Sequence, residues 1–323
     1  MPNNKAYFTP STNLRDDIGN KRLLDNVIVT KQITSAIELF SKSEKDIDNS
    51  AVSIVGPYGS GKSTTALFLY HYLTNTLGKG PGKKLSNHSI KVPEKPYKSS
   101  EISVLVGSKT SLEKSLKKKF YIKTSLVDHI REEYVNKNKR LILIIDEFGK
   151  YLEYSSDDPK NGDVYLLQEL AEMATRSNNL FKIITIRHQA IIGYFSGMKG
   201  SFLNEWKKIQ GRFHDIIHSN TIEDTFDLIE PHVEKLSVKN VKIPKKIMEL
   251  LVNNPSIGDL SKAAVLKNGY PFHPFTILIL VSAYKRFAQN ERSVFSFLNT
   301  DEIHGIRHFV KGDSGDFYSL SDF

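Results

Sequence analysis

A glycine-rich stretch carries the residues whose chemistry is clearest. It reads SIVGPYGSGKSTTALFLYHYL over residues 53–73 and matches the pattern G-x-x-x-x-G-K-[ST]. The motif comprises Gly56, Pro57, Tyr58, Gly59, Ser60, Gly61, Lys62 and Ser63, and Thr64 follows it. Glycines let the backbone turn tightly, so that successive N–H groups point inward and form a concave site for anions. We expect this loop to hold the phosphates of a nucleotide.

The segments on either side of the loop fit this interpretation. AVSIV (51–55) predicts a buried strand, and STTALFLYHYL (63–73) predicts a helix. A helix that begins at the loop adds its unpaired N–H groups and the positive end of its dipole to the anion site. Lys62 is then expected to reach the outer phosphates, and the Ser63 hydroxyl to be a ligand of Mg²⁺.

Two carboxylates supply a second half of the site. In LILIIDEFGKYLE (141–153), five aliphatic residues lead into Asp146 and Glu147. Polar side chains at the carboxyl ends of parallel strands face the ligand. We expect Asp146 to hold Mg²⁺ opposite Ser63, and Glu147 to orient or deprotonate a water that attacks the γ-phosphate. The sequence therefore predicts an ATPase, and Glu147 argues against a kinase because it indicates water as the nucleophile.

Polar residues at the end of another predicted strand are candidates for the same site. LFKIITIRHQ (180–189) ends at Arg187, His188 and Gln189. We favour His188 over Arg187 as the group that contacts the γ-phosphate or the attacking water. A helix cap or a surface charge is the alternative interpretation of this segment.

Two arginines outside these strands are further candidates. Arg212, in EWKKIQGRFHDI (205–216), lies at the end of a predicted helix and is a candidate arginine finger towards a neighbouring subunit. The alternatives are a favourable charge at the helix terminus or a pair with Glu205. Arg292, in FAQNERSVFSFL (287–298), is expected to bind the nucleotide from a helical lid, with a structural salt bridge as the alternative.

The remaining elements predict the architecture that positions these groups. Apolar strands over 51–55, 101–109, 141–146, 180–189 and 214–220 alternate with helices. This alternation is typical of a mostly parallel sheet covered on both faces. The predicted fold class is therefore α/β, a P-loop NTPase core followed by an all-helical lid subdomain. The expected divisions are an extended arm over 1–20, the ATPase core over 21–220 with a mobile basic loop at 78–100, and the helical lid over 221–323.

Composition narrows the classes of protein and of partner. The 323 residues include no cysteine, which excludes disulfides and cysteine-ligated metals. No apolar run approaches the ~20 residues needed to cross a bilayer, and the N-terminus is polar, so we expect a cytoplasmic protein without a membrane partner. The net charge of +9 favours nucleic acid as a partner. For the densest basic runs, 78–98 and 113–123, we favour a solvated loop and a solvated helix face over a nucleic-acid contact.

Histidine spacing gives no further metal site. His304 and His308 have helical spacing, and His214 and His218 lie in a predicted strand, but no third ligand accompanies either pair. We expect no metal besides Mg²⁺.

Taken together, these motifs resemble the AAA+ and STAND branch of P-loop ATPases, near the origin-recognition-type proteins. The segments LIIDEFGKYLE, LLQELAE, RHQ, EWKKIQGRFHDI and YPFHPFTILIL…FAQNERSVFSFL are similar to the N-terminal ATPase module of large prokaryotic defence ATPases, including the P-loop proteins of BREX-type phage-resistance islands. The resemblance covers about residues 25–310. Such proteins continue into a much longer chain, so we expect either a truncated protein or a short relative that keeps only the ATPase module.

This resemblance implies specific roles and partners. ATP is the implied nucleotide, and the implied assembly is a homo-oligomer or a complex with other defence-system proteins. His188 and Gln189 fall at the first sensor of the family, Arg212 at the arginine finger and Arg292 near a lid sensor. Arg187 departs from the family pattern, because an apolar residue is expected in its place.

Three functions remain open from the sequence. The first is an ATPase that drives assembly or conformational change in a defence complex. The second is a nucleotide-binding switch with negligible intrinsic turnover. The third is a DNA-loading or DNA-translocating ATPase, for which the basic charge is the only signal besides the resemblance.

Overall fold

The structure, a computed structural model, describes most of the N-terminal two thirds of the chain and short parts of the rest. The described residues are 12–20, 22–25, 27, 29–42, 50–57, 60–93, 95–158, 163–195, 201–218, 243–254, 271–276, 279, 305–311, 316–319 and 321–322. The chain divides into two compact units. The core unit comprises Ser11–Pro57 and Gly61–His218, and the second comprises Met1–Pro10, Tyr58–Ser60 and Ser219–Phe323.

A five-stranded parallel sheet forms the centre of the core unit. Its strands are β1 (Ala51–Val55), β2 (Ile102–Val106), β3 (Leu141–Asp146), β4 (Phe181–Arg187) and β5 (His214–Ile217). Their order is β2-β3-β4-β1-β5, and every neighbouring pair is parallel. The predicted α/β class is confirmed. Because β4 lies between β1 and β3, the carboxyl ends of these three strands are neighbours.

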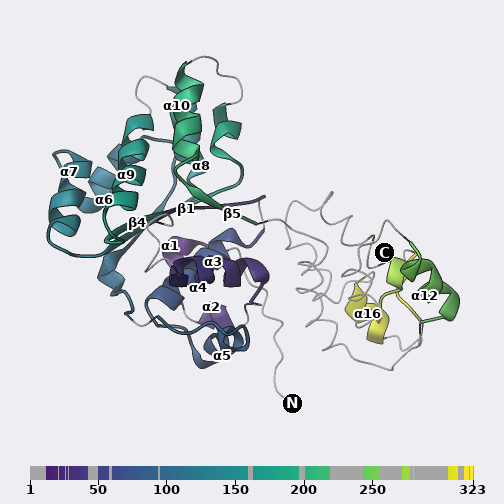
Figure 1. Cartoon of the computed structure of the whole chain (residues 1–323). Coiled ribbons are helices and arrows are strands. Elements are labelled where there is room, and N and C mark those ends of the chain that lie inside the picture. The colour runs from purple at the N-terminus through teal and green to yellow at the C-terminus, as the bar shows by residue number, and fades with distance from the viewer. Residues whose placement is uncertain are drawn as a thin grey trace. The chain divides into compact units, whose positions relative to one another are not determined.

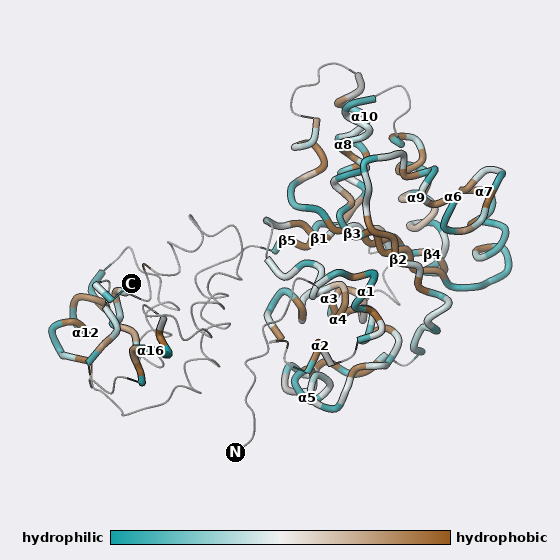
Figure 2. Tube along the Cα trace, turned by 180° about the vertical axis from the view of Figure 1, so that it is seen from behind, coloured by the Kyte–Doolittle hydropathy of each residue, from teal (hydrophilic) through white to brown (hydrophobic). Residues whose placement is uncertain are grey.

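Both faces of the sheet are apolar and covered by helices. Successive side chains of a strand point to opposite faces, so Leu143 and Ile183 belong to one core cluster, and Ile144 and Ile184 to the other. Figure 1 shows the helices on the two sides, and Figure 2 shows the hydrophobic strands between them. Isoleucine and leucine on both faces are typical of a parallel sheet buried on both sides.

The helices of the two layers differ in their position along the chain. One layer contains α6 (Leu112–Phe120), α7 (Leu126–Ile130), which continues as a π-helical turn over Arg131–Val135, α8 (Gly149–Asp157), α9 (Val164–Arg176), the short helix η4 (Ile191–Phe195) and α10 (Ser201–Gln210). The other contains α1 (Leu14–Asp17), α2 (Arg22–Asp25), α3 (Lys31–Lys42), α4 (Lys62–Leu73) and α5 (Lys79–Asn87).

Two segments differ from the sequence-based expectation. The predicted extended arm over 1–20 contains α1, and its Leu14 is fully buried in the core. The predicted mobile loop over 78–100 contains α5, and Leu85 is buried against the core. The neighbouring Lys84 Nζ donates to the carbonyl oxygen of Val27 at 2.8 Å. These tertiary contacts outweigh the glycine and proline content from which a loop was predicted.

The second unit is described only in part. Its described residues include α12 (Lys245–Val252), α16 (Ile306–Lys311) and an isolated β-bridge between Phe272 and Tyr318. Within the described part of the chain, no helix combines the length and apolar character that crossing a bilayer requires. The helical lid over 221–323 remains a prediction.

A buried carboxylate joins two helices of the core. Asp163 accepts hydrogen bonds from the Ser111 hydroxyl at 2.9 Å, the Leu112 N–H at 2.6 Å and the Glu113 N–H at 3.1 Å. These donors belong to the N-cap residue Ser111 and the first turn of α6, whereas Asp163 immediately precedes α9. The carboxylate thus satisfies N–H groups that have no partner within α6 and lies at the positive end of its dipole.

We expect Asp163→Ala to lower the free energy of unfolding by about 3 kcal/mol, because buried donors lose a charged acceptor. Urea unfolding measures this as a lower midpoint. The matched control is Asp128→Ala, since Asp128 is 67% exposed and its ion pair with Arg131 is on the surface. Asp128→Ala is expected to lower the free energy of unfolding by at most about 1 kcal/mol. Equal midpoints for the two variants would contradict the capping role.

Candidate nucleotide-binding site

The glycine-rich loop joins β1 to α4 as the sequence predicts. The Gly56 N–H donates to the Arg187 carbonyl oxygen at 3.2 Å, which extends the pairing of β1 with β4 into the loop. Gly61 precedes α4 with a φ of 76°, in the left-handed region where glycine has no steric penalty. The N-terminus of α4 therefore begins directly at the loop. Tyr58 and Gly59 lie outside the described residues.

Polar contacts hold the first residues of α4. Lys62 Nζ donates to the Pro57 carbonyl oxygen at 2.6 Å, so the ammonium group lies back across the loop. The hydroxyl oxygens of Thr64 and Thr12 are 2.9 Å apart. This contact joins the segment before α1 to the beginning of the phosphate-binding helix.

The structure brings Ser63 and Asp146 together. The Ser63 hydroxyl donates to Asp146 Oδ1 at 3.4 Å, and the Glu147 N–H donates to the same oxygen at 2.8 Å. Asp146 is 5% exposed. Burial raises the pKa of its carboxyl, while the bonds from Glu147 and Ser63 and the charge of Lys62 act in the opposite direction. A hydroxyl and a buried carboxylate are oxygen ligands of the kind Mg²⁺ prefers, so the residues fit this ion.

Glu147 has an unusual backbone conformation. Its φ is 48°, in the left-handed region that residues other than glycine rarely adopt. Its side chain is 48% exposed and forms an ion pair with Lys150 of α8. Strained backbone of this kind is often found at functional sites.

Gly107, which belongs to none of the sequence motifs, supports this turn. Its N–H donates to the Asp146 carbonyl oxygen at 2.8 Å. A Cβ atom added to Gly107 would lie 2.1 Å from the Glu147 carbonyl oxygen, so only glycine fits between β2 and the turn. A glycine directly after a buried strand was the available signal for such a close approach.

His188 lies at the end of the strand that separates the two halves of the site. It follows β4, whose neighbours are β1 with the loop and β3 with Asp146. Its Nδ1 is 2.8 Å from the hydroxyl oxygen of Tyr194. Burial lowers the pKa of His188; the charge of Glu153 raises it, and that of Lys62 lowers it further. The balance favours the neutral imidazole at neutral pH.

Arg187 has a different environment from His188. Its side chain is fully buried, with Nη2 donating to Asp215 at 2.6 Å and Nη1 to the Gln189 carbonyl oxygen at 2.8 Å. Arg187 lies on the same face of β4 as Thr185 and Ile183, and this is the sheet face opposite to α4. An arginine is accommodated where an apolar residue was expected because Asp215 of β5 pairs with it across β1.

Comparison with known proteins gives only distant similarity. No protein-family model matches the chain, and no curated protein matches it. Among solved structures, the Aeropyrum pernix ORC2 protein in its ADPNP–ADP complexes is similar with a TM-score of 0.37 and 12% identity, over 86% of this chain and 72% of that chain. Domain III of the Thermotoga maritima replication initiation protein DnaA is similar with a TM-score of 0.29 and 15% identity, over 86% of this chain and 95% of that chain. Both scores and both identities are low, so neither similarity indicates a function for this chain.

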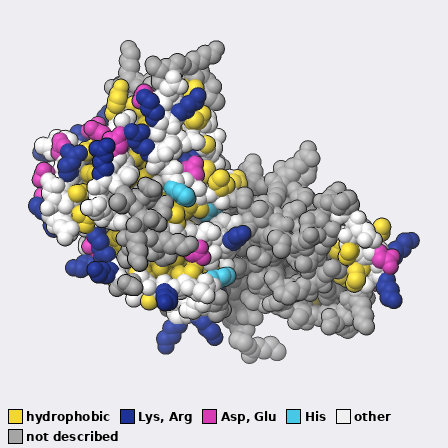
Figure 3. Space-filling model, viewed as in Figure 1, with side chains coloured by type: hydrophobic (Ala, Val, Ile, Leu, Met, Phe, Trp, Pro, Cys, Tyr) yellow, Lys and Arg dark blue, Asp and Glu magenta, His cyan; other side chains and the backbone are white. Residues whose placement is uncertain are grey.

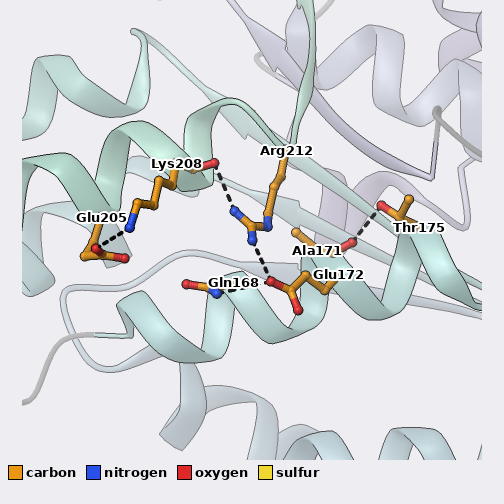
Figure 4. Close-up of polar contacts among 7 residues, drawn as sticks. All are labelled: Gln168, Ala171, Glu172, Thr175, Glu205, Lys208 and Arg212. Atoms are coloured by element: carbon orange, nitrogen blue, oxygen red, sulfur yellow. Dashed lines mark hydrogen bonds and ion pairs between the residues drawn. The ribbon is translucent and has the colours of Figure 1, made fainter.

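Arg212 pairs within its own chain. Figure 4 shows its side chain extending from the end of α10 to Glu172 of α9, where Nη2 donates to Oε1 at 2.6 Å. Glu205 pairs instead with Lys208, at 2.8 Å. The alternative partner suggested by the sequence, Glu205, is therefore wrong. The finger role stays a prediction, and Arg292 lies outside the described residues.

On the described surface seen in Figure 3, the basic side chains of the core unit are interspersed with acidic ones. Lys117 pairs with Glu113 on α6, and Lys137 pairs with Glu133 after α7. Figure 3 shows acidic side chains lying among the lysines and arginines. Nucleic acid as a partner stays a prediction.

The predicted histidine pairs are only partly described. His214 is exposed at the start of β5 and His218 is buried directly after it, and His308 is exposed on α16, whereas His304 lies outside the described residues. Within the described ranges, no group of three or more histidine, aspartate and glutamate side chains is placed to hold a metal ion.

Proposed function

We propose that the chain binds ATP together with Mg²⁺ at the glycine-rich loop and hydrolyses it to ADP and phosphate. The observation that carries this proposal is the approach of the Ser63 hydroxyl to the buried Asp146 carboxylate, at 3.4 Å, with Glu147 next in the chain. These groups come from α4 and the end of β3, at the edge of the sheet where ligands of parallel α/β proteins bind.

In this proposal, each group in the nucleotide-binding half of the site has its own role. Backbone N–H groups of the loop and the first turn of α4 bind the phosphates, and Lys62 neutralises the outer ones. Ser63 and Asp146 hold Mg²⁺. When bound, the ion neutralises charge on the phosphate oxygens. On the sequence resemblance, we also assign Arg292 to nucleotide binding.

The hydrolytic half uses Glu147 and His188. Glu147 accepts a proton from the water as its oxygen attacks the γ-phosphorus, and the bond from that phosphorus to the bridging oxygen breaks. His188 donates a hydrogen bond to the γ-phosphate or orients the water. Gly107 leaves room for the left-handed turn at Glu147, and this turn sets the direction in which the Glu147 side chain leaves the backbone before the nucleotide binds.

The cellular role that we propose follows from the sequence resemblance. ATP hydrolysis drives assembly or conformational change in a cytoplasmic anti-phage complex, as a homo-oligomer or with other defence proteins. The motifs quoted above support this role. No defence protein is among the similar proteins reported above, so the chemistry of the site is tested first.

A nucleotide-binding switch is a second candidate, supported by the ion pair between Glu147 and Lys150. In this ion pair a Glu147 oxygen is engaged with Lys150, so Lys150 competes with the attacking water for that oxygen. In this alternative, ATP stabilises one arrangement of core and lid without turnover. At one hundred times its dissociation constant, the nucleotide would stabilise the fold by about 2.7 kcal/mol.

ATP binding tests the proposal directly. We expect the wild type to bind ATP in calorimetry with Mg²⁺, and Lys62→Ala to weaken binding by roughly 10- to 150-fold, because a charged hydrogen bond to phosphate is lost. Chelation of Mg²⁺ should also weaken binding. The matched control is Lys119→Ala, since Lys119 is exposed on α6. A wild-type protein that binds no ATP would remove the proposed function, whereas binding without turnover would favour the switch.

A further inference from the structure

Tyr194 contacts two parts of the candidate site but has no role in the function proposed above. It belongs to η4, the short helix that follows β4. Its hydroxyl oxygen is 2.8 Å from Nδ1 of His188, and the two rings meet edge to face with centroids 5.0 Å apart. The tyrosine therefore restrains the imidazole both by a hydrogen bond and by ring contact.

The same hydroxyl packs against the turn that carries Glu147. A Cβ atom added to Gly149 would lie 2.3 Å from the Tyr194 hydroxyl oxygen, so the glycine leaves the space that this oxygen occupies. Gly149 begins α8 and lies two residues after Glu147. Tyr194 thus fills the space between the end of β4 and the beginning of α8.

The helix that carries Tyr194 is itself held in place. Phe195 stacks on Trp206 of α10, with ring centroids 4.2 Å apart, and both side chains are buried. The Ile192 N–H donates to Gln210 Oε1 at 3.1 Å. A side chain on such a packed element has few alternative positions, so the Tyr194 hydroxyl keeps one position relative to the residues that it contacts.

We propose that Tyr194 is a positioning residue for ATP hydrolysis, whose hydroxyl fixes the ring of His188 as a hydrogen-bond donor and sets its separation from the Glu147 turn. This inference rests on the proposed function, in which His188 acts on the γ-phosphate or the attacking water. A hydrogen bond to one ring nitrogen selects the tautomer at the other. If the tyrosine hydroxyl donates to Nδ1, the hydrogen of the neutral ring is on Nε2, and that N–H suits an anionic phosphate oxygen.

Tyr194→Phe tests the proposal because it keeps the ring and removes the hydroxyl. We expect kcat for ATP to fall about tenfold or more, with KM and ATP affinity within about twofold, because a misplaced donor affects the transition state more than the bound substrate. The control is Tyr165→Phe, which removes a hydroxyl from a residue that is 73% exposed on α9. Its kcat should equal that of the wild type.

A double variant separates positioning from a general packing effect. If Tyr194 acts through His188, His188→Gln combined with Tyr194→Phe should have the same kcat as His188→Gln alone. If the two substitutions instead lowered kcat by factors that multiply in the double variant, the proposal would be overturned, since the tyrosine would then act independently of the histidine.

A spectroscopic measurement gives an answer that does not need turnover. Ring nitrogen NMR of the 10 histidines, with His188 assigned from His188→Gln, should show the Nε2–H tautomer in the wild type and its loss in Tyr194→Phe. If the wild type hydrolyses ATP but neither kcat nor the tautomer changes in Tyr194→Phe, the inference fails and the proposed function stands. If the wild type does not hydrolyse ATP, the proposed function fails, and an unchanged tautomer in Tyr194→Phe would overturn the positioning role as well.

Discussion

Replacement of Glu147 by glutamine is expected to reduce ATP turnover by about 10²–10⁴-fold, the usual contribution of a general base. An amide has nearly the shape of the carboxylate but cannot accept a proton from the attacking water. The substitution leaves the Glu147 N–H that donates to Asp146 in place and changes only the side chain, which pairs with Lys150. ATP affinity should therefore stay within about threefold of the wild type.

The measurement combines single-turnover hydrolysis with equilibrium binding of ATP. Single turnovers isolate the chemical step from product release, and the binding experiment shows whether the site is intact. Glu169→Gln is a matched control, since Glu169 is exposed on α9. Normal turnover in Glu147→Gln would sink the assignment of Glu147. Loss of binding instead would indicate that the left-handed turn had been disturbed.

The parts of the site that the sequence predicts are those with a local pattern. The loop requires glycines at fixed spacing, and the aliphatic run before Asp146 predicts its strand without knowledge of any neighbour. The alternation of strands and helices then predicts a parallel sheet, which brings the loop and Asp146 to one edge. The structure confirms the strands and the approach of Ser63 to Asp146.

Contacts between segments far apart in the chain could not be predicted in this way. Arg187 is buried because Asp215 of β5 pairs with it across β1, and neither residue identifies the other in the sequence. Gly107 and Gly149 matter because of the oxygen atoms that approach them, from Glu147 and Tyr194 respectively. A single sequence records that a residue is glycine but not which atom lies against it.

The partner of Arg212 was likewise not predictable from the sequence, and in this case the consequence for function is larger. Helical spacing suggested Glu205 as its partner, but the actual partner is Glu172 of the preceding helix. That ion pair is about one-third exposed on both sides, at 31% and 35%. Pairs of this kind contribute at most about 1 kcal/mol, so Arg212 can exchange Glu172 for another anion at low cost.

Arg212→Ala is expected to lower the ATPase rate by about 10³–10⁵-fold if the arginine acts as a finger towards a neighbouring subunit. The rate per protomer should then rise with protein concentration in the wild type and stay low at all concentrations in the variant. Lys207→Ala is the control, because Lys207 is exposed on the same helix. A structural role would predict a stability loss of about 1 kcal/mol and little change in rate.

Mixing two inactive variants distinguishes an action between subunits from one within a subunit. Arg212→Ala keeps Glu147, and Glu147→Gln keeps Arg212, so a mixed assembly contains interfaces where an intact Glu147 faces an intact Arg212. If the arginine acts on a neighbour, the mixture should regain activity that neither variant has alone. If Arg212 acts only within its own chain, every protomer lacks one group and the mixture stays inactive. A wild-type rate that is low, independent of concentration and unaffected by Arg212→Ala would instead indicate a monomeric switch, in which Arg212 serves only to hold α10 against α9.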